Sequence, residues 1–165
     1  MSNCKEFLSQ VLDKLGEYFE NHSFRLVHSY EDGKFDHCFL IFISEKCCLK
    51  LIRDRDNVII KLAPLWADRN YYGGIEEDWF SIGTVMVLLR DMDEDLANFT
   101  SPLMQVESSG SNIRAESRVE RELEKYRALF LALGDVLFAI FETNRFEAYK
   151  IRLKALAKPQ QNMLE

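Results

Sequence analysis

The sequence predicts an α+β fold, a four-stranded antiparallel meander with an N-terminal helix and a long C-terminal helix packed mainly on one face. Three observations predict it. Apolar residues recur at helical spacing over residues 3–20, four apolar runs separated by short links fill residues 24–64, and helical spacing returns over residues 118–158. Links of a few residues join antiparallel neighbours, because a parallel pair needs a long crossover.

The N-terminal helix is expected because one face of residues 3–20 carries Phe7, Val11 and Leu15 at helical spacing, whereas the opposite face is charged. Turn residues such as Asp32-Gly33 then divide the chain into strands. The second run is apolar on both faces, which is typical of a central strand. The four strands are expected at residues 24–31, 35–44, 47–54 and 57–64.

The second half is expected to be helical. A short helix is predicted over residues 79–92, with Ser81 as its cap. Residues 100–117 are rich in Ser and Gly and predict a mobile loop, followed by the long helical region 118–158 with a break near Asn144. The 165 residues therefore form one domain, in which residues 1–99 contain the first helix, the meander and the short helix.

An alternating four-three spacing of apolar residues marks the long helix and is typical of a packed seam. The stripe is wide, since Val136 and its neighbours add a second apolar face. We expect the N-terminal part of this seam to need a partner, which predicts a two-fold homodimer. The interface is assigned to Val119, Leu123, Tyr126 and Phe130.

The net charge of −6 argues against nucleic-acid binding, which requires clustered Lys and Arg. It favours a basic protein partner instead. The most apolar stretch, residues 126–141, is too short and too charged to span a membrane, and no targeting signal is recognised. The four cysteines form no C-x-x-C pair, so reduced core thiols and a cytoplasmic protein are expected.

The hairpin tip at Arg53-Asp54-Arg55-Asp56 is the first candidate site. On an extended strand, Arg53 and Arg55 share one face and could grip a phosphate or carboxylate. The simpler interpretation is a solvated turn, in which the carboxylates bond the backbone and the arginines stay in water. We favour the turn and retain a partner contact as the alternative.

Aromatic and acidic side chains crowd the segment between the fourth strand and the short helix, as they often do at interfaces. They could equally fold back over the sheet. The partner-binding candidates here are Trp66, Tyr71, Tyr72, Glu76, Glu77, Asp78 and Trp79. A second acidic set, Asp91, Asp93, Glu94 and Asp95, follows the short helix, where the helix dipole disfavours anions.

No motif for a nucleophile, a phosphate loop or a metal site occurs, so neither a cofactor nor catalysis is expected. The stretches CCLKLIRDRDNVIIKLAP and DWFSIGTVMVLL resemble a group of small bacterial α+β proteins, some of them proposed as immunity or accessory proteins of polymorphic toxin systems. The resemblance covers residues 3–92 and transfers no catalytic residue.

The expected function is therefore non-catalytic protein binding in a bacterial cytoplasm. Its concrete form is an immunity-type protein that masks a basic toxin. Two alternatives remain: a secretion-type chaperone dimer that holds an extended effector segment, and a small-ligand domain or enzyme that uses the Arg53/Arg55 face.

Overall fold

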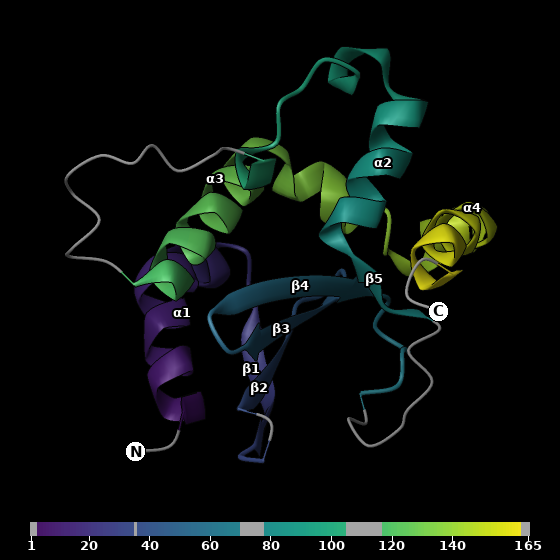
Figure 1. Ribbon diagram of the computed structural model, residues 1–165. Helices are drawn as coiled ribbons and strands as arrows, with labels where there is room; N and C mark the ends of the chain where they lie inside the picture. The colour runs from purple at the N-terminus through teal and green to yellow at the C-terminus, as the bar shows by residue number, and fades with distance from the viewer. Residues whose placement is uncertain (1–2, 35, 70–77, 105–116, 163–165) are drawn as a thin grey trace.

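A computed structural model of the chain describes residues 3–34, 36–69, 78–104 and 117–162 (Figure 1). Helices and strands follow one another as the periodicity predicts. Their bounds are α1 Asn3–Asn21, β1 Arg25–Asp32, β2 His37–Ile43, β3 Cys48–Asp54, β4 Asn57–Ala63, β5 Phe80–Ser81, α2 Ile82–Met92, η2 Glu94–Leu96, η3 Pro102–Met104, α3 Arg118–Ala139 and α4 Thr143–Asn162.

The five strands lie in the order β1-β2-β3-β4-β5, and every neighbouring pair is antiparallel. This confirms the predicted α+β meander, with the two-residue β5 as an addition that no sequence pattern announced. Strand β5 leads directly into α2, whose predicted cap is confirmed: the Ser81 hydroxyl accepts a hydrogen bond from the Thr84 amide at 3.3 Å.

The helices cover one face of the sheet. In Figure 1, α3 crosses above the strands between α1 at one end and α2 and α4 at the other. The side chains of Leu40, Leu51 and Ile60 form one row across three strands and are fully buried beneath these helices. The principal core also contains Phe7, Phe130 and Phe146, one from each of α1, α3 and α4.

The C-terminal region is two helices rather than one long helix. The chain turns at residues 140–142, a few residues before the predicted break, where the Phe141 amide bonds the Phe138 carbonyl at 3.1 Å. The turn lets Phe141 and Phe146 stack with ring centroids 5.6 Å apart, and both are fully buried. Residues 105–116 of the predicted mobile loop lie outside the described residues.

The prediction of four reduced thiols is wrong for one pair. Cys4, in the first turn of α1, forms a disulfide with Cys38 of β2, and their Cα atoms are 5.3 Å apart. Cys47 and Cys48 are free and buried. Sequence spacing carries no signal for a pair 34 residues apart that meets only when α1 packs on the sheet. The disulfide removes the support that reduced thiols gave to a cytoplasmic location.

Candidate functional site

The two arginines of the β3–β4 hairpin do not form a shared grip. Arg55 lies in the turn itself, exposed and in the left-handed region with φ of 56°. Arg53 is held in place: its guanidinium pairs with Asp36 at 3.0 Å and donates to the carbonyl of Arg55 at 3.2 Å. The geometry therefore favours a structural turn, with one arginine committed to neighbouring loops.

Trp79 covers the sheet instead of facing a partner. Its side chain is buried against the sheet face opposite the helices, in a small cluster with Ile41 and Cys48. The indole nitrogen donates to the Asp68 carbonyl at 2.8 Å, and the Lys50 ammonium lies 4.3 Å from the ring centroid. The assignment of Trp79 to a partner surface is wrong, because the segment folds back over the sheet.

Trp66 is half-exposed and packs edge-on against Phe146, with ring centroids 5.6 Å apart. Lys150 of α4 lies 5.2 Å from the same ring and pairs with Asp78 at 3.4 Å. These contacts join the segment after β4 to α4. Four further candidates, Tyr71, Tyr72, Glu76 and Glu77, lie outside the described residues.

The seam assigned to a dimer interface is buried within one chain. Val119, Leu123, Tyr126 and Phe130 are all part of the principal core, and the Tyr126 hydroxyl donates to the Val58 carbonyl of β4 at 3.3 Å. The reason given for placing them at an interface is therefore wrong, since α1 and the sheet already cover them. A homodimer remains a prediction, and it would have to use another surface.

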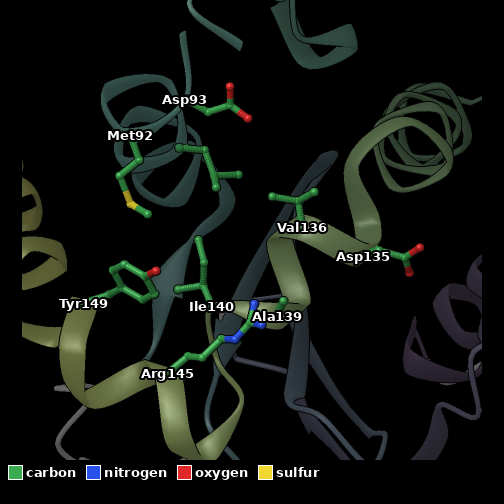
Figure 2. Close-up of a pocket in the computed structure, with 9 residues that line it drawn as sticks. Met92, Asp93, Asp135, Val136, Ala139, Ile140, Arg145 and Tyr149 are labelled. Carbon is green, nitrogen blue, oxygen red and sulfur yellow. The ribbon is translucent and has the colours of Figure 1, made fainter. Parts of the chain in front are cut away.

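A groove between α2, α3 and α4 is the largest feature that the sequence did not place. It has a volume of about 490 Å³ and is called the helix groove; its lining includes Met92, Asp93, Val136, Ile140, Arg145 and Tyr149. Figure 2 shows Met92, Arg145 and Tyr149 directed towards the space in front of Ile140, with Asp135 pointing away from it.

The floor of the helix groove is closed and its walls are apolar. Leu89 and Ile140 are buried beneath it, whereas Met92 and Val136 are 40% and 44% exposed. Two exposed apolar side chains that flank one concave space resemble the unfilled centre of an interface.

Acidic side chains stand beside this groove. Asp93, on its rim, and the adjacent Glu94 and Asp95 are exposed at the end of α2, where they face the negative end of the helix dipole. Asp91 is partly compensated, because Arg152 of α4 pairs with it at 2.6 Å. The second acidic set of the sequence is therefore gathered at one edge of an apolar hollow.

The titratable groups with shifted pKa values lie elsewhere, in the core. Burial raises the pKa of the Tyr126 phenol to about 12 and raises the pKa of the Tyr18 phenol further. Burial also raises the pKa of the thiols of Cys47 and Cys48. A buried thiol with a raised pKa is a poor nucleophile, so these cysteines are packing residues.

Among the residues that the structure describes, no cluster of His, Cys, Asp and Glu is placed to hold a metal ion. No helix within the same residues is long and apolar enough to cross a membrane. No family model, no curated protein and no solved structure matches the chain significantly.

The helix groove left two traces in the sequence. The carboxylates after α2 oppose the local helix dipole, and Val136 belongs to the second apolar face of the long helix. Neither trace shows that the two segments meet, because their contact depends on the turn that separates α3 from α4.

Proposed function

We propose that the chain is a non-catalytic protein-binding protein, and that the helix groove receives an apolar segment of a basic partner. The observation that carries this proposal is the pairing of exposed Met92 and Val136 over a closed floor with carboxylates on the rim. Burying two such side chains contributes about 1.5–3 kcal/mol each when they become fully covered. The acidic rim would steer and orient a partner rich in Lys and Arg.

The chemistry of the groove supports binding over catalysis. Its carboxylates have structural partners: Asp93 accepts a hydrogen bond from the Asp95 amide at 2.9 Å, and Asp135 lies 3.8 Å from the His22 ring. The described lining contains no serine, cysteine, histidine or lysine that a neighbouring base could activate. Arg145 and Tyr149 are suited to hydrogen bonding and stacking on a bound segment.

An immunity-type protein that masks a basic toxin is the concrete form of this proposal. Inhibition of this kind needs only a complementary surface, which an apolar hollow with an acidic rim provides. A secretion-type chaperone is the runner-up, and the neighbouring gene separates the two: a toxin gene favours immunity, an effector gene favours the chaperone. The small-ligand alternative has less support, because Asp36 already occupies Arg53.

The test compares two exposed apolar positions. Val136→Glu places a charge in the helix groove, whereas Ile151→Glu makes the same change on α4 at a side chain that is 81% exposed and outside the lining. Proteins retained by each tagged variant are quantified by mass spectrometry, and the best candidate is purified and titrated by calorimetry. Thermal melting confirms that both variants stay folded.

We expect a basic protein to bind the wild type and Ile151→Glu equally and Val136→Glu at least tenfold more weakly. Adding Asp93→Lys should weaken binding further and reduce its dependence on salt. If the partner is a toxin, its coexpression should arrest growth only beside Val136→Glu. Equal binding to the two glutamate variants, or a partner that is acidic, would contradict the proposal.

A further inference from the structure

Strand β1 is the uncovered edge of the sheet. It pairs with β2 on one side, and among the described strands none pairs with its other side. None of its eight residues is buried, in contrast to the five buried residues of β3. An edge strand presents unpaired N–H and C=O groups along its length, which form a template for another extended chain.

A hollow runs between this edge and α1. It has a volume of about 580 Å³ and is called the edge groove; Leu8, Leu12 and Gly16 line it from the helix, and Leu26 lines it from β1. Leu12 is 50% exposed and Leu26 is 39% exposed. Because Gly16 has no side chain, the helix leaves space where any other residue would project.

The base of the edge groove is rigid and aromatic. Phe19, Phe24 and Phe42 are buried beneath it, and the Phe19 ring lies 4.7 Å from that of Phe42 and 5.5 Å from that of Phe24. The three rings come from α1, the start of the first hairpin and β2. A packed floor of this kind holds the distance between α1 and β1 fixed, so that the hollow is largely pre-formed.

The charge of the edge groove selects among occupants. Glu17 and Glu20 line it and are exposed, and they are the charged residues of its described lining. A second copy of this chain, paired through β1 across a two-fold axis, would bring the same carboxylates of both copies to one interface. A basic chain gains from these carboxylates instead, and the net charge of −6 attracts it from a distance.

We propose that the edge groove binds an extended, basic segment of a partner protein by β-strand addition. The segment pairs its main chain with the outer edge of β1, and its alternate apolar side chains enter the hollow between Leu12 and Leu26. Its Lys or Arg residues lie beside Glu17 and Glu20. Main-chain pairing supplies affinity and the pockets for alternate side chains supply specificity, as in other modes of strand addition.

The irregularity of β1 defines where pairing takes place. The register with β2 shifts between Leu26 and His28, so the strand bulges there. Residues 28–32 pair regularly with β2 and offer the straight part of the edge. The bulge also limits the length over which two copies of this strand could pair, which disfavours aggregation through the edge.

This site goes beyond the proposed function, because it uses α1 and β1 rather than the helix groove of α2, α3 and α4. The two can be tested separately. A variant that blocks one groove leaves the other unchanged, so loss of the basic partner from Val136→Glu reports on the helix groove alone.

The experiment selects binders from a phage-displayed library of random twelve-residue peptides on the wild-type chain. Gly16→Leu is the blocking variant: a Cβ at this position has only the Leu12 side chain within 4 Å, at 3.8 Å, and leucine favours a helix more than glycine does. A second variant combines Glu17→Lys with Glu20→Lys, and Glu147→Lys on α4 is the matched charge control. Enriched sequences are synthesised, and one version carries N-methyl groups on alternate amides.

The expected peptides alternate apolar residues with Lys or Arg. They should bind Glu147→Lys like the wild type, and bind Gly16→Leu and the double lysine variant at least tenfold more weakly. Bound peptide should slow amide hydrogen exchange in residues 28–32, and alternate N-methylation should abolish binding. No enrichment, equal binding to Gly16→Leu, or tolerance of N-methylation would each overturn the proposal. A wild-type dimer that Gly16→Leu converts to folded monomers would overturn it in favour of a second copy.

Discussion

The two faces of the sheet are both apolar, but they are covered by different kinds of structure. On one face, the fully buried row of Leu40, Leu51 and Ile60 lies under helices that contribute large aromatic side chains. On the other face, Ile41 and its neighbours lie under a short cluster that includes Ala63, Ala67 and Trp79. An apolar pattern on both sides of a strand therefore shows that both faces are covered, and it does not show by what.

The difference also explains where a charge can be buried. Lys50 belongs to β3, in register with Ile41 and Lys61, and its side chain is only 3% exposed on the face opposite the helices. The Trp79 ring lies over its ammonium group, an arrangement that favours a cation electrostatically. The helix-covered face has no comparable charge among the described core residues. The thinner cover is thus the one that accommodates polar groups.

The largest expected effect is on the helix-covered face. Leu51→Asp places an unpaired carboxylate in the centre of the fully buried row, and its cost should exceed the whole free energy of unfolding, which is about 5–15 kcal/mol for a domain. Circular dichroism should show no cooperative melt. Ile59→Asp is the control, because Ile59 is partly exposed on β4; a folded Leu51→Asp protein with a wild-type melt would show that the row is not the core.

A smaller effect is expected on the loop-covered face. Trp79→Ala removes the cover over Ile41 and Cys48 and should lower the free energy of unfolding by about 3 kcal/mol, within the range for large core aromatics. Urea denaturation measures the change. Trp66→Ala is the control and should cost clearly less, since Trp66 is half-exposed. If the two variants were equally stable, Trp79 would not be the main cover of this face.

The smallest effect concerns a polar group under the helices. Burial raises the pKa of Tyr126 from 10.0 to about 12, so its neutral form stabilises the fold fully below pH 10 and this contribution is lost as pH rises from 10 to 12. The loss should reach about 1.4 kcal/mol near pH 11. Tyr126→Phe should lose about 1 kcal/mol at neutral pH with the hydrogen bond to Val58.

Urea denaturation of both proteins at pH 8 and pH 11 checks this expectation. The wild type should lose more stability than Tyr126→Phe over that interval. Parallel losses would mean that the phenol ionises in the folded protein as easily as in the unfolded chain.

Local signals predicted the elements that local forces determine. The helical spacing of Phe7, Val11 and Leu15 placed α1, the short links placed four strands, and Ser81 marked the start of α2. The face of α3 that carries Leu123 and Tyr126 was also identified as the packed face. What covers that face was not, because coverage depends on α1 and the sheet, which lie far away in the sequence.

The candidate sites were harder to predict for the same reason. The sequence marked the carboxylates after α2 and the apolar Val136, but only the turn at residues 140–142 brings them to one groove. Trp79 was assigned to a partner surface because an aromatic residue in a loop looks alike whether it faces water or folds back. The edge groove depends on the absence of a side chain at Gly16, which no periodicity reveals.

The disulfide between Cys4 and Cys38 makes the first part of the chain a covalent ring. Because the bonded residues are 34 apart, closing the ring restricts the unfolded chain by about 4 kcal/mol on the chain-entropy estimate. The ring contains all of β1 and nearly all of α1, the two walls of the edge groove. A chain severed within this ring would remain one molecule until it is reduced, and its two walls would stay paired in number and identity.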